Sequence, residues 1–282
     1  MKIAFAFIGT NRYLDFFPKY YEGIEKYFVP EAEKTFLVFT DGEIDDPPDN
    51  VKVYHQEHLE WPYITLKRFE IINKARSVIE ECDWFVFLDA DTRVVSEITE
   101  EDFLERCCGQ STNEIPLFGV HHPCQYLWMP PHDKIPGAWD QNPESEAFMD
   151  FDTIELCRVL PDKSRLKLYR DEENPGDFKW YNHEQTYYQG CFWGGKVPQV
   201  CAMIDELEAR TNRDLEKGVI AKWHDESHIN KFYYENIFRV HVFGPEYAFP
   251  EVFKEECKKN YHFRSHEPKI VHLAKDNSAY QI

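Results

Sequence analysis

The sequence predicts an α/β protein with a mainly parallel sheet that is flanked by helices. Three observations indicate this fold class. Short apolar runs, typical of buried strands, alternate with stretches of helical periodicity. The chain has 282 residues, 43% of them hydrophobic, which is enough to cover both faces of such a sheet. Polar residues follow the ends of several strands, where open α/β sheets bind ligands. We expect one domain over residues 1–282.

The first half of the chain alternates strands with helices. Residues 3–8 are apolar at every position and predict a first buried strand, and an aromatic helix is expected from about 13 to 28. The next expected elements are a strand in KTFLVFT, a strand in VKVYH, a helix from about 65 to 81, and a strand in DWFVFL. Such an alternation brings the carboxyl ends of parallel strands to one edge of the sheet.

The second half begins with a loop-rich insertion, about residues 125–182, which is marked by PPHDKIPGAW and DEENPGD. Regular patterns return after it. The expected elements are a strand in TYYQGCFWGGK, a helix whose apolar residues recur from 200 to 215, a helix in DESHINKFYYEN, and strands in FRVHVF and KIVHLAK.

Composition and charge exclude several classes of protein. A net charge of −19 repels phosphate backbones, so nucleic acid is not an expected partner. The eight cysteines contain no CxxC pair and indicate reduced thiols. The N-terminal apolar stretch is too short to span a bilayer and is not followed by a cleavage site. We therefore expect a cytoplasmic protein without a membrane anchor.

Asp89 and Asp91 form the first candidate site, at the end of the apolar run WFVFL. Residues two apart in an extended chain point the same way, so both carboxylates can face one hard cation. Ligation by oxygen favours magnesium or manganese over zinc. A polar turn that closes a buried strand is the alternative interpretation of a bare Asp-x-Asp. The place at a strand's carboxyl end favours the cation site.

The segment WHDESHIN forms the second candidate site. His224 and His228 are four residues apart and could share a zinc ion, which would make the protein a metal-dependent hydrolase. The order of residues argues against this, because Glu226 lies about 200° around a helix from His224. We expect Asp225 to cap the helix and Glu226 to project beside it. A capped amphipathic helix without a catalytic role is the simpler alternative.

Aromatic residues surround small ones in YYQGCFWGG, the third candidate site. Such a segment lets a ligand ring approach the backbone at Gly190, whereas in the alternative the aromatics pack in the core and Gly194 and Gly195 form a strand-to-helix turn. A carbohydrate-binding module without turnover also fits the aromatic content of 16%. Arg68 and Lys275 could meet a diphosphate or be ordinary surface cations.

Taken together, these segments resemble glycosyltransferase family six, which contains the histo-blood-group A and B transferases and the α-1,3-galactosyltransferases. The matching segments, in the family's order, are WPYITLKRFEII, FVFLDADTRVV, FGVHHP, YYQGCFWGGKVPQV, AKWHDESHINKF and FGPEY. The resemblance implies a GT-A fold and transfer of galactose or N-acetylgalactosamine from the UDP sugar to a saccharide, with retention and in α-1,3 linkage. It implies manganese as the cofactor, with magnesium as the alternative.

The resemblance also implies roles for individual residues. The donor nucleotide and its phosphates would be bound by Ile8, Gly9, Thr10, Tyr13, Arg68 and Lys275, and the metal by Asp89 and Asp91. The donor sugar would be selected by Gln189, Gly190 and Cys191, the acceptor would contact His122 and Trp223, and the catalytic acidic pair would be Asp225 and Glu226.

The chain also departs from the family's pattern. Pro250 stands where the family has an acidic acceptor contact, so a different acceptor is expected. About thirty extra residues before YYQG predict a lid or an acceptor-binding insertion. Gln281 stands where a second phosphate-binding arginine is expected. Many bacterial members of the family replace the two aspartates of the metal site, but this chain keeps Asp89 and Asp91. The membrane anchor of the vertebrate members is missing, which predicts a soluble microbial or viral form.

Overall fold

The computed structural model describes residues 1–105, 116–123, 140, 142–149, 169–170, 178–179, 187–236, 239–260, 263 and 267–275. Every candidate site residue named above lies in these ranges. Most of the expected insertion at 125–182, with its extra residues, lies outside the described residues, as does Gln281.

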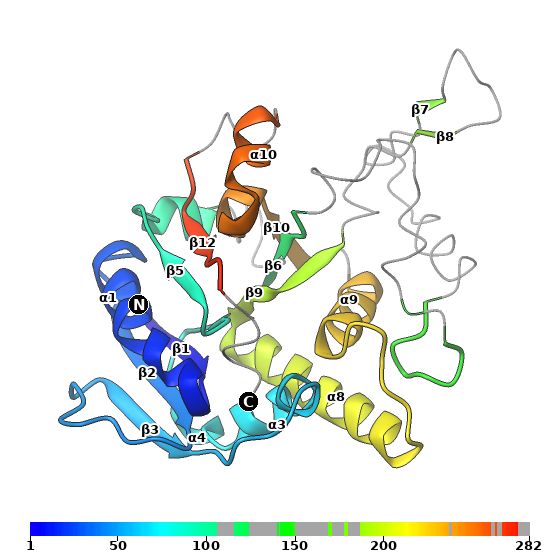
Figure 1. Ribbon diagram of the computed structural model, residues 1–282, viewed down its shortest axis with the longest axis horizontal. Helices are drawn as coiled ribbons and strands as arrows, with labels where there is room; N and C mark the ends of the chain where they lie inside the picture. Colours follow the sequence, from blue (N-terminus) through cyan, green and yellow to red (C-terminus); the bar gives the residue numbers. More distant parts are fainter. Residues whose placement is uncertain are drawn as a thin grey trace.

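A seven-stranded sheet forms the centre of the fold, in the order β10-β6-β9-β4-β1-β2-β3 (Figure 1). Its strands are β1 (Lys2–Ile8), β2 (Glu33–Thr40), β3 (Val51–His55), β4 (Trp84–Leu88), β6 (Leu117–His121), β9 (Tyr188–Lys196) and β10 (Val240–Phe243). β1 to β4 run parallel to one another, and β6 runs parallel to β10. β9 runs antiparallel to both of its neighbours. The predicted α/β fold with a mainly parallel sheet is thus confirmed.

Helices cover both faces of the sheet because buried side chains alternate along its strands. In β1, Ile3 and Phe7 pack in one core cluster with α1 (Phe17–Tyr27), and Ala4 packs in a second cluster with α3 (Arg68–Asn73) and α8 (Val197–Glu216). The apolar runs read as strands therefore form the centre of the core.

The helix expected from 65 to 81 is broken into three short ones: α2 (Tyr63–Leu66), α3 and α4 (Arg76–Ile79). Lys67 and Ala75 stand at the breaks with ψ values of 5° and 14°. Because the helix breaks at Lys67, the side chains of Lys67 and Arg68 point in different directions. Lys67 donates to Asn212 of α8, while Arg68 turns into the protein and is 7% exposed.

Gly194 and Gly195 lie inside β9, and α8 begins only at Val197, so the turn interpretation was wrong. A Cβ atom on Gly194 would collide with the carbonyl oxygen of Phe85, and one on Gly195 with that of Pro116. Glycine is needed here because the neighbouring backbones approach closely.

A second sheet brings the C-terminal part of the chain to the end of β4. Its strands are β5 (Thr92–Val94), β11 (Phe249–Pro250) and β12 (Ile270–His272), in the order β11-β12-β5. β12 pairs antiparallel with β5, and this register places His272 opposite Thr92. Pro250, which departs from the family's pattern, lies in β11 and pairs with His272 of β12.

The remaining elements are short, except for the helix Asp225–Glu235. They are the 3-10 helices Asn11–Phe16, Pro245–Tyr247 and Glu251–Phe253, the π turn Glu101–Glu105, the strand pair β7 (Tyr169–Arg170) and β8 (Phe178–Lys179), and the helices α9 (Asp225–Glu235) and α10 (Lys254–Lys259). Across the described ranges, no helix combines the length and apolarity that crossing a membrane requires. The cysteines at 82, 191, 201 and 257 are free thiols.

His228 of α9 is buried next to Asp214 of α8 and makes the stability of the fold depend on pH. His228 is 0% exposed, its Nε2 atom lies 3.6 Å from Asp214 Oδ2, and burial lowers its pKa to about 4. Below its ordinary pKa of 6.5 the unfolded chain binds a proton that the folded chain rejects, so acid favours unfolding. We expect this histidine alone to remove about 2 kcal/mol of the unfolding free energy between pH 7 and pH 5.

Urea unfolding at the two pH values measures this effect. His228→Gln removes the titrating group and should flatten the pH dependence by that amount. The matched control is His55→Gln, which changes an exposed histidine of β3. A slope in His228→Gln as steep as in the unsubstituted chain would contradict the assignment.

Candidate active site

Asp89 and Asp91 lie in the loop between β4 and β5, at the carboxyl end of β4, as the sequence predicts. Backbone hydrogen bonds hold this loop from several sides. The Asp89 amide donates to the carbonyl of Cys191 (3.0 Å), and the Thr92 amide donates to that of Asp89 (3.0 Å). The Leu273 amide donates to the carbonyl of Asp91 (2.9 Å), which ties the C-terminal segment to the loop.

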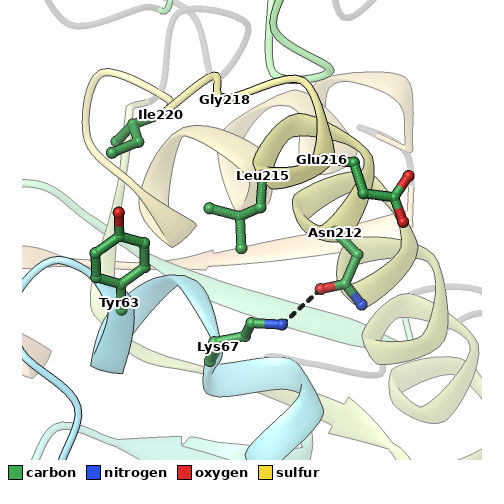
Figure 2. Close-up of a pocket in the computed structure, with 7 residues that line it drawn as sticks. All are labelled: Tyr63, Lys67, Asn212, Leu215, Glu216, Gly218 and Ile220. Carbon is green, nitrogen blue, oxygen red and sulfur yellow. Dashed lines mark hydrogen bonds between the residues drawn. The ribbon is translucent and has the colours of Figure 1, made fainter.

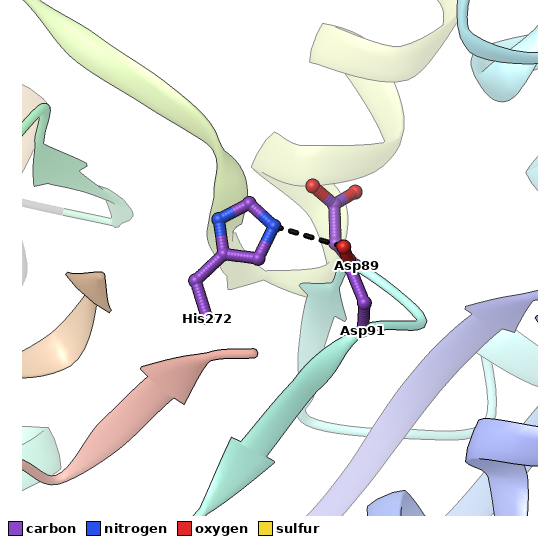
Figure 3. Close-up of side chains that lie close together, drawn as sticks. All are labelled: Asp89, Asp91 and His272. Atoms are coloured by element: carbon purple, nitrogen blue, oxygen red, sulfur yellow. Dashed lines mark hydrogen bonds and ion pairs between the residues drawn. The ribbon is translucent and has the colours of Figure 1, made fainter. Parts of the chain in front are cut away.

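His272 completes a group of three possible metal ligands with the two aspartates (Figure 3). One ligand atom from each residue lies within 4.8 Å of the others, and His272 Nε2 is 3.1 Å from Asp91 Oδ2. The other ring nitrogen lies 3.3 Å from Gln189 Nε2, which helps to orient the imidazole. Two carboxylates and an imidazole fit a divalent cation. In the described part of the chain, this is the one such group of three.

Lys275 reaches the same aspartate. Its Nζ atom is 2.5 Å from Asp91 Oδ2 and donates to the hydroxyl of Tyr13 at 2.8 Å. Burial by itself raises the pKa of Asp91, but His272 and Lys275 outweigh it and hold that pKa well below its usual range. The structure thus places the predicted phosphate-binding lysine and Tyr13 beside the predicted metal ligands.

Arg68 connects this group with the acidic pair of α9. Its guanidinium forms ion pairs with Asp89 (2.9 Å) and Asp225 (2.6 Å) and donates to the carbonyl of Gly190 (3.0 Å). It also lies over the ring of Phe87, at 4.3 Å from the centroid. Protein groups therefore engage Arg68 on several sides, and its position links the two sets of carboxylates.

Glu226 faces the backbone of β9. Its Oε2 atom accepts a hydrogen bond from the Gly190 amide at 2.8 Å, and burial raises the pKa of Glu226 to about 7. Burial also raises the pKa of Asp225 to about 7, although Arg68 opposes this shift. Asn230 fastens the helix to the strand, since its side chain bonds both backbone groups of Tyr188. The backbone of β9 and the Arg68 guanidinium thus position the two carboxylates, and burial raises the pKa of both.

The predicted cap of this helix was wrong. The N-cap residue is His224, which makes no side-chain cap hydrogen bond, and the carboxylate of Asp225 faces Arg68. The Arg68 guanidinium gives this buried carboxylate an opposite charge, which a buried charge requires. His224 adopts φ 54°, a left-handed conformation that is rare outside glycine.

The structure also separates the two histidines of the zinc alternative. His228 is enclosed next to Asp214, whereas His224 precedes the helix and its ring packs edge-on against Trp61 at 4.6 Å. Neither belongs to a group of three metal ligands among the described residues. The geometry therefore does not support a zinc hydrolase that uses this pair.

The residues implied for the nucleotide follow the carboxyl end of β1. The Gly9 amide donates to the carbonyl of Phe39 (3.0 Å), and Thr10 Oγ1 lies 3.0 Å from His58 Nδ1. Ile8 ends the strand, and Tyr13 reaches Lys275. Because β1 is parallel and adjacent to β4, this segment lies at the same edge of the sheet as the two aspartates.

Residues 189–191 of β9 alternate in direction, as strand residues do. Gln189 faces His272, and a Cβ atom on Gly190 would lie 3.4 Å from Glu226 Cβ. Cys191 is 1% exposed and belongs to the core. Gly190 thus lies against the acidic pair, and Cys191 lies beneath the surface.

The two implied acceptor residues lie near the site in different settings. The His122 amide donates to the carbonyl of Tyr187 (2.8 Å), and burial, with a contribution from nearby His272, lowers the pKa of His122 to about 4. Trp223 is 48% exposed just before the acidic pair.

Sequence reasoning missed His272 and His58. The signal for His272 was its place three residues before Lys275 in KIVHLAK. No local pattern marks His58.

Comparison with known proteins gives consistent matches. The family model for Glycosyltransferase family 6 matches residues 169–270. The O-antigen biosynthesis glycosyltransferase WbnI of Escherichia coli is 28% identical over 260 residues, which cover 90% of this chain and 91% of that protein. Histo-blood group ABO system transferase 2 of Rattus norvegicus is 23% identical, over 88% of this chain and 64% of its own length.

Globoside alpha-1,3-N-acetylgalactosaminyltransferase 1 of Homo sapiens is 22% identical, over 89% of this chain and 62% of its own length. The chain thus spans less than two thirds of the rat and human relatives.

Proposed function

The chain belongs to glycosyltransferase family 6, and we propose that it transfers galactose or N-acetylgalactosamine from the UDP sugar to a saccharide, with retention and in α-1,3 linkage. The arrangement around Arg68 is the observation that carries this proposal. One guanidinium joins a carboxylate of the possible metal site, Asp89, to a carboxylate of the acidic pair, Asp225. In one bound donor, the diphosphate would lie at the metal site and the anomeric carbon at the acidic pair, so the two groups of carboxylates would have to lie side by side.

Asp89, Asp91 and His272 would hold the cation, for which we propose manganese. A divalent ion there supplies positive charge to the departing diphosphate. Lys275 adds a second positive charge at the same point, and the Tyr13 hydroxyl fixes the direction of its side chain. Ile8, Gly9 and Thr10, at the end of β1, would receive the uridine.

Glu226 would act at the anomeric carbon. A carboxylate in poorly hydrated surroundings stabilises an oxocarbenium-like centre strongly, or it attacks that carbon as a nucleophile. Double displacement and front-face transfer both accommodate this placement. Asp225 would hold sugar hydroxyls, and Arg68 would keep Asp225 and Asp89 at a fixed separation.

A screen of UDP sugars tests the proposed function. The protein is incubated with manganese, each UDP sugar and a panel of oligosaccharides, and both UDP and product are followed. We expect UDP release from UDP-galactose or UDP-N-acetylgalactosamine and an α-linked product by the anomeric coupling in NMR. Release from neither donor, or a β-linked product, would overturn the proposal.

Cys191 offers a test of donor choice. Cys191→Gly removes a buried core side chain of β9 next to Gly190, so this stretch of β9 can shift toward the core. We expect the ratio of kcat/KM for the two donors to change by several-fold. The matched control is Cys201→Ala, a buried cysteine of α8 in the other core cluster, which should leave the ratio unchanged. Equal ratios in both variants would remove residue 191 from donor selection.

His272 offers a test of the metal group. We expect His272→Ala to weaken Mn²⁺ binding by roughly ten- to a hundredfold, as seen when groups around a metal site are removed. The measurement is titration of free Mn²⁺ by electron paramagnetic resonance, without any turnover. His55→Ala on the surface of β3 is the control. Unchanged affinity in His272→Ala would exclude the histidine from the metal site.

A further inference from the structure

Large exposed hydrophobic side chains gather beside the candidate active site. Four of the eight such side chains among the described residues lie in two short segments: Trp61 and Tyr63 before and in α2, and Ile220 and Trp223 between α8 and α9. The segments contact each other through the rings of Trp61 and His224. Such a concentration of exposed apolar surface marks an interaction site.

A cavity of about 570 Å³ lies between these segments and the end of α8 (Figure 2). Tyr63, Leu215 and Ile220 form its apolar lining. Lys67, Asn212 and Glu216 supply hydrogen-bonding groups, and Lys67 bonds to Asn212 across the base of the cavity. The volume falls within the roughly 300–1,000 Å³ of ordinary small-molecule sites.

We propose that this cavity binds the part of the acceptor saccharide that lies beyond the reacting sugar. The inference rests on the proposed function and deepens it. A saccharide has apolar ring faces and many hydroxyl groups, and the lining offers an aromatic ring together with both donors and acceptors. An anionic ligand fits less well, because the cation Lys67 is already paired with Glu70 at 2.6 Å and Glu216 adds negative charge.

The backbone connects the cavity to the reacting centre on two sides. Ile220 lines the cavity, and the chain then passes through Trp223 to Asp225 and Glu226. On the other side, Lys67 faces the cavity while its neighbour Arg68 pairs with Asp225. The proposal therefore places the saccharide chain from the acidic pair over exposed Trp223 toward Tyr63.

A glycan array tests the inference through binding. Protein saturated with UDP and Mn²⁺ is applied to oligosaccharide series that share a terminal sugar and differ in length from one to four units. We expect the longer members to bind more tightly, and we expect Tyr63→Ala and Ile220→Ser each to reduce that gain by roughly tenfold. Val252→Ser, at an exposed position outside these segments, is the control.

Donor hydrolysis separates this inference from the proposed function. Slow release of UDP from the UDP sugar in the absence of a saccharide uses the reacting centre but not the cavity, and it should be equal in all four proteins. Absence of hydrolysis in the unsubstituted chain counts against the proposed function. Binding that is independent of glycan length, or equal in the cavity variants and the control, overturns the cavity as a saccharide site.

Discussion

Glu226→Gln should lower kcat by roughly a hundred- to a thousandfold while changing the KM for the UDP sugar little. The carboxylate would act on charge that develops only in the transition state, so its loss appears in kcat. Such a loss corresponds to about 3–4 kcal/mol. The amide is similar in shape, and its oxygen can still accept the Gly190 hydrogen bond. Kinetics at saturating acceptor give both constants.

The fold should tolerate this change. Asn230 bonds to the carbonyl of Glu226 and to the backbone of Tyr188, and both interactions remain when the carboxylate becomes an amide. Thermal unfolding and UDP binding of the variant verify this. Glu255→Gln, on the exposed surface of α10, is the control for loss of a carboxylate. Near-normal kcat in Glu226→Gln with intact UDP binding would mean that the acidic pair is structural.

The same residue predicts a pH dependence. Burial raises the pKa of Glu226 to about 7, so the carboxylate is mostly protonated below that pH. If the ionised form acts at the anomeric carbon, kcat/KM, which reports the free enzyme, rises as the pH passes upward through about 7. Burial also raises the pKa of Asp225 to about 7, so this rise in activity with pH reports the titration of both carboxylates together. In Glu226→Gln the rise should disappear, or its midpoint should shift to the pKa of Asp225 alone.

The sequence predicted β1, β2 and β4 well because each of them has apolar residues at successive positions, a signal that depends on nearest neighbours only. β1 and β4 are the clearest cases, since both of their faces are covered by helices. The sequence did not predict β6, which lies in the central sheet. The helix at 65–81 was predicted too long because the periodicity continues across Lys67 and Ala75, where the backbone leaves the helical conformation. Those breaks depend on contacts with α8, which local sequence does not record.

In the candidate site, too, the sequence revealed the features with a local signal and missed those that depend on tertiary contacts. The pair Asp89 and Asp91 could be found because both residues follow one strand. The sequence could mark His272 only by its place near Lys275 and could not join it to Asp91, because 181 residues separate the two and the register of β12 against β5 brings them together. The role of Arg68 between two carboxylates likewise depends on tertiary structure, whereas the sequence shows only one cation in an acidic chain.

Removal of the metal should have an effect as large as the loss of Glu226. We expect excess chelator to lower transfer by roughly a hundredfold or more, because a divalent ion contributes several kcal/mol to stabilising the charge on a departing diphosphate. Added Mn²⁺ should restore it. In Asp89→Asn with Asp91→Asn, activity should be equally low and Mn²⁺ should not rescue it, as measured by UDP release.

The double variant could also fail by unfolding, since Asp89 pairs with buried Arg68 and Asp91 with Lys275. Arg68 keeps its second partner, Asp225, so the folded state should survive with a lower melting temperature. The chelator experiment on the unsubstituted chain removes this ambiguity, because it leaves every side chain in place. Full activity in excess chelator would show that Lys275 and Arg68 alone balance the diphosphate, and Asp89 and Asp91 would then serve to hold those two cations in position.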